Sequence, residues 1–254
     1  MVIGIEKFRE YFAGHEDKYA IIGGAACDLL FDAAGLPFRA TKDIDLVLCV
    51  EVVDATCGER FAAFLDAGGY QARERSEGGR EYFRFRKPTD EAFPFMIELF
   101  ARKPNVIDIP DGDLYARIPV DEAAVSLSAI LLDDDYFQAL QSATRLVEDV
   151  TILGETLLIP FKARAFLDLS GRLADGEKID KKNIKKHRND VFRLIQLLPG
   201  DAAVELPPSI RGDLRRFIDA IEQDDGFDPK SFEVKMSREE GVSTLRSVYR
   251  LTSS

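Results

Sequence analysis

A glycine pair and a pair of aspartates, each set beside a short apolar run, constrain this 254-residue chain more than any other feature. Tyr19-Ala-Ile-Ile22 leads into Gly23-Gly24, and Asp43-Ile44-Asp45 leads into Leu46-Val-Leu48. Short apolar runs bounded by turn signals are typical of buried strands. The pattern therefore predicts a strand, a tight glycine turn that opens a helix, and a later strand that carries both carboxylates.

The glycine pair favours a bound phosphate. Glycine lets the backbone approach a ligand closely, and the first N–H groups of the following helix point toward whatever lies there. A plain tight turn would explain Gly23 and Gly24 on their own.

Asp43 and Asp45 strengthen the first interpretation. Residues two apart on a strand share a face, and two carboxylates on one face repel unless a cation lies between them. Magnesium prefers such oxygen ligands together with phosphate. The alternative is an exposed strand end with solvated aspartates, but the glycine pair upstream favours a phosphate and metal site.

Glu98 is the third candidate carboxylate. It is the one charged residue of the apolar run Phe95–Phe100, where an unpaired carboxylate would be costly. It could serve as a third metal ligand or as the base for an incoming hydroxyl. The alternatives are an edge-strand glutamate or an ion pair with an arginine such as Arg84.

The order of elements predicts an α/β (α+β) fold, with a mixed N-terminal sheet flanked by helices and a mainly helical C-terminal part. We place the domains at 1–120 and 121–254. Expected strands cover 18–22, 43–50, 81–86 and 93–100, with a short pair around Gly154 within 145–159. Expected helices cover 3–13, 25–34, 54–67, 121–143, a segment opened by Pro160, 184–198, 209–223 and 237–249.

Composition limits the classes of protein. The net charge of −11 opposes tight nonspecific attraction to nucleic acid but leaves room for a local basic patch. We find no apolar stretch of membrane-spanning length and no secretion signal. Three cysteines, Cys27, Cys49 and Cys57, lack the close spacing of a zinc site. We expect reduced thiols, a cytoplasmic location and no membrane partner.

The helical half contributes Lys162. It lies on the apolar stripe of Phe166, Leu169 and Leu173, in what we expect to be the first turn of a helix that Pro160 opens. A cation is unfavourable there, so a triphosphate would explain it. The alternative is that its stem lies along apolar surface.

A second polar group lies near residue 190. His187 and Asp190 interleave with an apolar helical stripe, and they could form a local hydrogen bond or face a nucleotide or acceptor. The run from Asp180 to Arg188 is a basic cluster, either a solvated face or a surface that attracts nucleotide or RNA. The run Asp133-Asp-Asp135 is expected to cap the helix before Tyr136.

These motifs together resemble the nucleotidyltransferase superfamily: Gly-Gly, then Asp-x-Asp, then one more acidic strand residue. More specifically, roughly residues 18–198 resemble the AbiEii-type nucleotidyltransferases, the toxin class of type IV toxin–antitoxin and phage-defence systems. The matching strings are Arg39-x-Thr41-x-Asp43-Ile-Asp45, Lys162 with Ala165, and Lys186-His-Arg-Asn-Asp190. His187 stands where that family has an aspartate.

The resemblance implies transfer of a nucleoside monophosphate from a nucleoside triphosphate to a hydroxyl, with release of pyrophosphate. It implies that Asp43 and Asp45 hold two magnesium ions and that Glu98 completes the metal site or activates the hydroxyl. The implied nucleotide-binding residues are Gly23, Gly24, Arg39, Thr41, Lys162 and Asp190. The helical domain would complete the active-site cleft, and a cognate antitoxin is an implied partner.

Three functions remain open from the sequence. The first is a toxin-like enzyme that modifies transfer RNA. The second is the same chemistry on a protein side chain or a small molecule. The third is a degenerate fold that acts as a binding partner or antitoxin, against which the intact set of Asp43, Asp45 and Glu98 argues.

Overall fold

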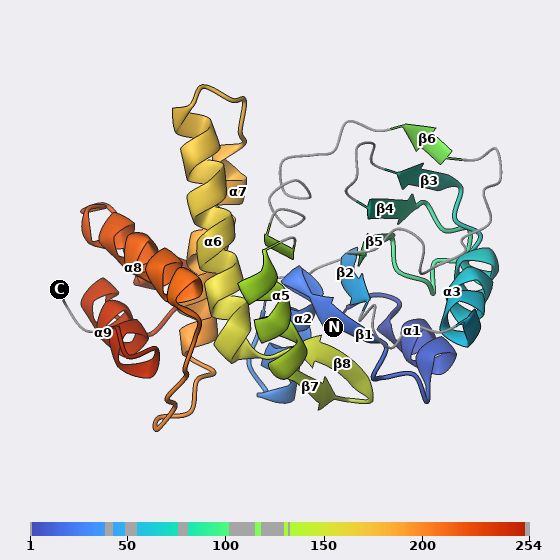
Figure 1. Ribbon diagram of the computed structural model, residues 1–254, viewed down its shortest axis with the longest axis horizontal. Coiled ribbons are helices and arrows are strands. Elements are labelled where there is room, and N and C mark those ends of the chain that lie inside the picture. Colours follow the sequence, from blue (N-terminus) through green and yellow to red (C-terminus); the bar gives the residue numbers. More distant parts are fainter. Residues whose placement is uncertain are drawn as a thin grey trace. The chain divides into compact units, whose positions relative to one another are not determined.

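The computed structural model describes residues 2–38, 43–48, 55–75, 81–101, 115–117, 130–131 and 133–251. The described chain mixes helices and strands and confirms the predicted α+β class (Figure 1). It separates into two compact units, one of Met1–Asp121 with Thr144–Gly154 and one of Glu122–Ala143 with Glu155–Ser254. The segment Thr144–Gly154 thus belongs with the first unit, although it follows the boundary drawn after residue 120.

The first unit holds an eight-stranded mixed sheet in the order β6-β3-β4-β5-β2-β1-β8-β7. Three neighbouring pairs are parallel, β1 with β8, β2 with β5 and β3 with β6, and the others are antiparallel. The elements of this unit are α1 (Ile5–Phe12), β1 (Tyr19–Ile22), α2 (Gly23–Ala33), β2 (Asp43–Leu48), α3 (Ala55–Gly68), β3 (Ala72–Arg75), β4 (Glu81–Arg86), β5 (Met96–Ala101), β6 (Tyr115–Arg117), β7 (Thr144–Val147) and β8 (Val150–Leu153).

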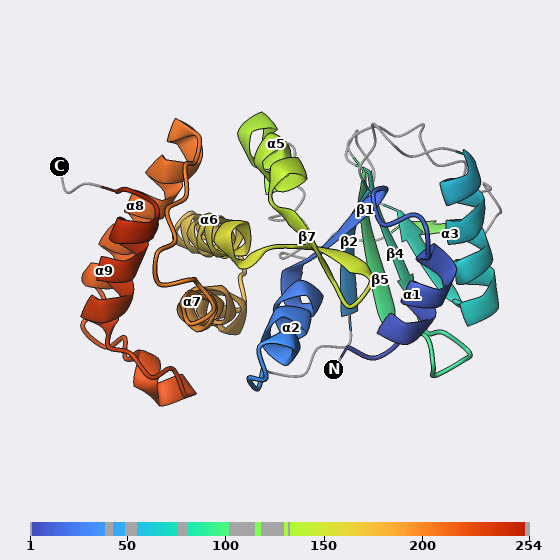
Figure 2. The same cartoon turned by 90° about the horizontal axis from the view of Figure 1, so that it is seen from below.

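An aromatic core fills one face of this sheet. Phe64 of α3 meets Phe8 of α1 edge to face at 5.8 Å, and Phe61 of α3 meets Phe85 of β4 at the same centroid distance. Figure 2 shows α1 and α3 on this face and α2 on the other. Because side chains alternate along a strand, the residues directly before and after Phe85 in β4 point to the opposite face, which α2 covers.

The turn between β7 and β8 differs from the prediction. We expected Gly154 to separate the two strands, but the strands meet at Glu148 and Asp149, with φ of 47° and 62°. Two consecutive left-handed residues make the type of two-residue hairpin turn that matches strand twist. Gly154 instead follows β8, directly before the next helix.

The second unit is helical in its described part. Its elements are α5 (Asp134–Ser142), α6 (Glu155–Ala174), α7 (Lys181–Ile195), α8 (Pro208–Glu222), the 3₁₀ turn η1 (Pro229–Phe232) and α9 (Arg238–Val248). Helix α6 packs on α7 and α8, and α9 packs on α7 and α8. Of the helix expected over 121–143, the part after Asp133 is confirmed as α5, while 118–129 lie outside the described residues.

Helix α6 begins five residues earlier than predicted, so Pro160 lies inside it rather than opening it. An internal proline has no N–H for the carbonyl four residues back, here that of Thr156. The Tyr249 hydroxyl donates to that carbonyl oxygen at 2.8 Å. The Tyr249 hydroxyl thus replaces the helical N–H donor that Pro160 lacks. The expectation that Lys162 occupies the first turn of its helix is wrong for the same reason.

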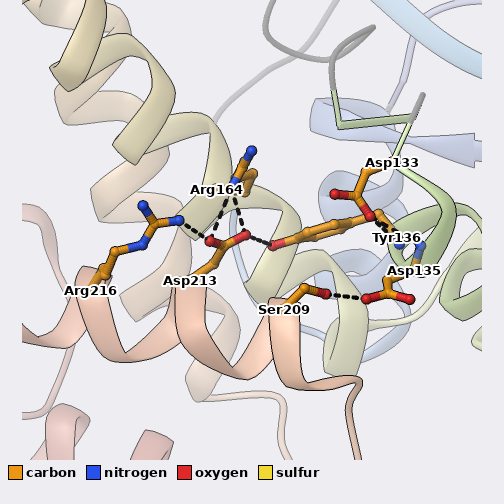
Figure 3. Close-up of polar contacts among 7 residues, drawn as sticks. All are labelled: Asp133, Asp135, Tyr136, Arg164, Ser209, Asp213 and Arg216. Atoms are coloured by element: carbon orange, nitrogen blue, oxygen red, sulfur yellow. Dashed lines mark hydrogen bonds and ion pairs between the residues drawn. The ribbon is translucent and has the colours of Figure 1, made fainter.

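Asp213 of α8 joins three helices (Figure 3). Its carboxylate accepts a hydrogen bond from the Tyr136 hydroxyl at 2.9 Å and two from Nη1 of Arg164, both at 2.9 Å. Arg216, one turn along α8, also donates to it. Asp213 is 3% exposed. Its buried negative charge is paired with the guanidinium groups of Arg164 and Arg216.

The start of α5 behaves as predicted. The Asp133 carboxylate accepts hydrogen bonds from the backbone N–H groups of Asp135 and Tyr136, so the predicted cap within 133–135 is confirmed and lies at Asp133. Ser209 of α8 donates to the Asp135 carboxylate (Figure 3). In the described part of the chain, no helix combines the length and apolar character needed to cross a membrane.

Candidate active site

One row of register partners crosses the centre of the sheet in the first unit. Ile22 of β1 pairs with Asp45 of β2, Asp45 pairs with Glu98 of β5, and Glu98 pairs with Arg84 of β4. Directly paired residues have Cβ atoms about 5 Å apart. The structure therefore brings the positions of two predicted acidic residues together with an arginine, although 53 residues separate Asp45 from Glu98 along the chain.

The glycine turn lies at the end of the same row. Gly23 follows Ile22 directly and has a φ of +69°, a conformation that favours glycine. Helix α2 starts there, and its N-cap residue, Ile22, offers no side-chain hydrogen bond to the first N–H groups. Gly24 is buried within the first turn. The predicted order of strand, glycine turn, helix and neighbouring acidic strand is thus confirmed.

The Glu98 carboxylate pairs with Arg84. Oε1 of Glu98 accepts hydrogen bonds from Nε of Arg84 at 2.9 Å and from Nη2 at 2.6 Å. Both side chains are largely buried, and Glu98 as a whole is 8% exposed. One of the alternatives that the sequence left open, an ion pair with Arg84, is therefore present. The roles of Glu98 as metal ligand or base stay predictions.

Asp43 and Asp45 are placed through their backbone. Both belong to β2 and flank Ile44, which is fully buried in register with Ile97 of β5. Their side chains lie outside the described residues, as do Arg39 and Thr41 altogether. Among the side chains that are described, no cluster of three His, Cys, Asp or Glu residues could hold a metal.

The acidic positions nevertheless suit magnesium by their chemistry. Carboxylate oxygens are the ligands this ion prefers, and it usually binds through a few carboxylates and substrate phosphates. Asp45 of β2 and Glu98 of β5 are direct register partners. Asp43 lies two residues before Asp45 on the same face of β2. The donor set at this point of the sheet fits the predicted ion.

Lys162 and Asp190 form an ion pair within the second unit. Nζ of Lys162 lies 3.3 Å from Oδ2 of Asp190, with Lys162 on α6 and Asp190 on α7. Asp190 is fully buried and Lys162 is 5% exposed. Oδ1 of Asp190 accepts from Nη1 of Arg193, also at 3.3 Å. Two residues predicted separately to contact nucleotide thus contact one another, and their role toward nucleotide stays a prediction.

His187 is half-buried on α7. It is followed by Arg188, whose guanidinium donates to Asp224 at 2.5 Å and lies 4.2 Å from the ring centroid of Phe227. Burial lowers the pKa of Arg188, and Asp224 opposes that shift. Arg188 therefore belongs to a structural contact with the segment after α8 and not to an open basic surface.

Arg84 and Arg193 are the charged partners that sequence reasoning underrated. Arg84 was named as one alternative for Glu98, and the alternation of Phe83 and Phe85 around it signals a polar face. Arg193 went unnoticed, although its spacing of three from Asp190 on a helix predicts contact. Cys27 and Cys57 are buried and form no disulfide, and Cys49 lies outside the described residues.

Comparisons with known proteins give little beyond this geometry. No protein-family profile matches the chain, and no curated protein does. The chain is similar to a solved structure, an antigenic nucleotidyltransferase-like protein from Paracoccidioides brasiliensis, at 17% identity and a TM-score of 0.45. The similarity covers 97% of this chain and 91% of that one.

Proposed function

We propose that this protein is a nucleotidyltransferase that moves a nucleoside monophosphate from a nucleoside triphosphate to a hydroxyl acceptor. The observation that carries the proposal is the register row in which Asp45 and Glu98 are neighbours and Gly23 opens α2 beside them. A helix N-terminus next to carboxylates offers one place for phosphate and an adjoining place for its cation.

In this proposal the backbone N–H groups at Gly23 and Gly24 bind the outer phosphates of the triphosphate. Magnesium held by Asp43, Asp45 and Glu98 would neutralise phosphate charge during the transfer, as two such ions do in related chemistry. Arg39 and Thr41 add phosphate contacts. The resemblance to AbiEii-type enzymes is the ground for assigning Lys162 and Asp190 to the nucleotide as well.

The reaction forms a bond from the acceptor oxygen to the α-phosphorus. The bond between that phosphorus and the bridging oxygen of the β-phosphate breaks, and pyrophosphate leaves with the electron pair. The hydroxyl proton passes to a carboxylate, for which Glu98 is our candidate. Arg84 keeps the Glu98 side chain in place by donating twice to Oε1.

The acceptor we favour is transfer RNA, which would make the protein a toxin of a toxin–antitoxin or phage-defence system with a cognate antitoxin. Four exposed lysines near the start of α7 support an RNA acceptor over a protein side chain or small molecule, since a phosphate backbone is the natural partner of such a group. We propose that the protein acts in the cytoplasm.

Incubation with each α-labelled nucleoside triphosphate and a cell extract tests the proposal. We expect label from one triphosphate to appear in the small-RNA fraction, and growth to stop when the wild-type protein is expressed without its antitoxin. Label in protein bands would instead support a protein acceptor. The absence of label from every fraction, with every triphosphate, would contradict the enzyme.

A further inference from the structure

Five lysines fall within the nine residues 178–186, in the loop before α7 and in its first turns. We define the α7 lysine surface as four of these lysines, all of them exposed: Lys178, Lys181, Lys182 and Lys185. The acidic residue within this run is Asp180, whose carboxylate accepts from the backbone N–H of Lys182 as the helix cap. The surface is therefore a local excess of positive charge in a chain of net charge −11.

Carboxylates of the described chain do not neutralise this surface. None of its four lysines forms an ion pair within the part of the chain that the structure describes. The arginines around it behave differently, because Arg172 pairs with Glu177 and Arg188 pairs with Asp224. Glu177 and Asp224 thus pair with arginines, while the four lysines face solvent.

The position of the lysines on the helix is unfavourable. Lys181 and Lys182 are the first two residues of α7, where the helix end carries partial positive charge. A cation there is unfavourable. Local choices that oppose the fold in this way are expected at functional or strained sites.

The composition of the surface indicates its partner. The large apolar side chains that are exposed in the described chain, Ile3, Leu36, Phe95 and Leu146, all lie in the other unit. A helix that binds a membrane surface needs an exposed apolar face, and protein interfaces are depleted in lysine. Flexible lysines without an apolar neighbour suit a chain of phosphates, which they neutralise without reading bases.

We propose that the α7 lysine surface binds the phosphate backbone of RNA. Binding depends on charge and not on sequence, so its affinity falls steeply with salt. The identification of that RNA as the acceptor rests on the proposed function, whereas RNA binding itself does not.

Fluorescence anisotropy without any nucleoside triphosphate tests the proposal, with labelled bulk transfer RNA and labelled oligouridine as probes. The test variant replaces all four lysines with glutamine. The matched control replaces Lys230 and Lys235 with glutamine; both are exposed in the same unit, lie outside the surface and form no ion pair with another described residue. Equal thermal midpoints of the three proteins establish that each is folded.

We expect the wild type to bind both probes at low salt, with a slope of log affinity against log salt of about −3 for four neutralised phosphates. The fourfold variant should lose about tenfold or more in affinity and show a shallower slope, while the control stays within twofold of the wild type, as sites that make no contact should. Equal affinity of wild type and fourfold variant would overturn the proposal.

Binding of the wild type to vesicles of anionic lipid or to an acidic peptide, but to neither RNA, would also overturn it. Different results would contradict the proposed enzyme and the proposed RNA-binding surface. RNA binding that depends on the lysines, without any label transfer, would remove the enzyme and keep the surface. Label transfer to RNA that the fourfold variant performs unchanged would remove the surface and keep the enzyme.

Discussion

Asp45 and Glu98 are direct register partners on the neighbouring parallel strands β2 and β5. The same row continues to Arg84 on β4, which donates two hydrogen bonds to one Glu98 oxygen. The centre of the sheet therefore carries two acidic residues and the guanidinium group of Arg84. We expect substitution of each of these three residues to change stability or activity.

Removal of Arg84 should destabilise the first unit through Glu98. Arg84→Met removes the guanidinium that donates twice to the buried Glu98 carboxylate, and breaking a buried pair in this way costs about 3–5 kcal/mol. The double variant Arg84→Met with Glu98→Gln should recover more than half of the loss, because the remaining side chain is uncharged. Urea unfolding of the four proteins measures the cycle, and a double variant as unstable as the sum of both single changes would contradict the pairing.

The Tyr249 hydroxyl should stabilise the fold because it donates to the Thr156 carbonyl, which Pro160 leaves without a helical N–H donor. Tyr249→Phe removes the donor to the Thr156 carbonyl and should lower the free energy of unfolding by about 1–3 kcal/mol, the cost of an unsatisfied buried carbonyl. In a Pro160→Ala background a helical N–H becomes available to the same carbonyl, so the loss should shrink. A loss of equal size in both backgrounds would show that the hydroxyl acts elsewhere.

Alkaline pH should unfold the protein through its buried phenols. Burial raises the pKa of four tyrosine hydroxyls well above the ordinary value: Tyr19, Tyr70, Tyr136 and Tyr249. At Tyr136 the nearby Asp213 carboxylate raises the pKa further. In the unfolded chain these phenols lose their protons near their usual pKa of about 10. The stability they contribute is complete below that pH and is lost as the pH rises above it, since only the folded state holds the protons.

Absorbance near 295 nm measures this directly, because the chain has seven tyrosines and no tryptophan. Fewer than seven should ionise near pH 10 in the folded protein, and the rest should ionise together with unfolding. Tyr19→Phe should make the fall in unfolding free energy with pH less steep. Complete ionisation of all seven at an ordinary pKa, with the fold retained, would contradict the burial of these phenols.

The sequence predicts local structure well where the pattern is local. The strand before Gly23, the cap at Asp133 and the alternation of β4 follow from neighbouring residues, and the structure confirms them. The start of α6 could not be predicted, because the hydroxyl that replaces the N–H missing at Pro160 comes from Tyr249, 93 positions after Thr156, whose carbonyl oxygen it reaches. The strand β3 escaped notice because Arg73, Glu74 and Arg75 leave no apolar alternation.

The candidate site shows the same division. Spacing indicated that Asp43 and Asp45 share a face, but which strand lies beside them depends on the pairing of β2 with β5, which no local pattern encodes. The pairing of Lys162 with Asp190 is likewise a contact between two helices. A candidate list of residues can be read from a sequence, whereas the groups they form depend on long-range packing.

The most direct measurement of the central claim is transfer of label from α-labelled nucleoside triphosphate to RNA by wild type, Asp45→Asn and Glu91→Gln. Asp45→Asn keeps the size of the side chain but removes the charge that would hold magnesium. Glu91→Gln makes the same change at an exposed carboxylate in the connection between β4 and β5.

We expect transfer by the wild type and by Glu91→Gln at similar rates, and a loss of about a thousandfold or more in Asp45→Asn, equivalent to several kcal/mol of transition-state stabilisation. Transfer by Asp45→Asn at the wild-type rate would contradict the account, because the acidic row of the sheet would then have no part in the chemistry.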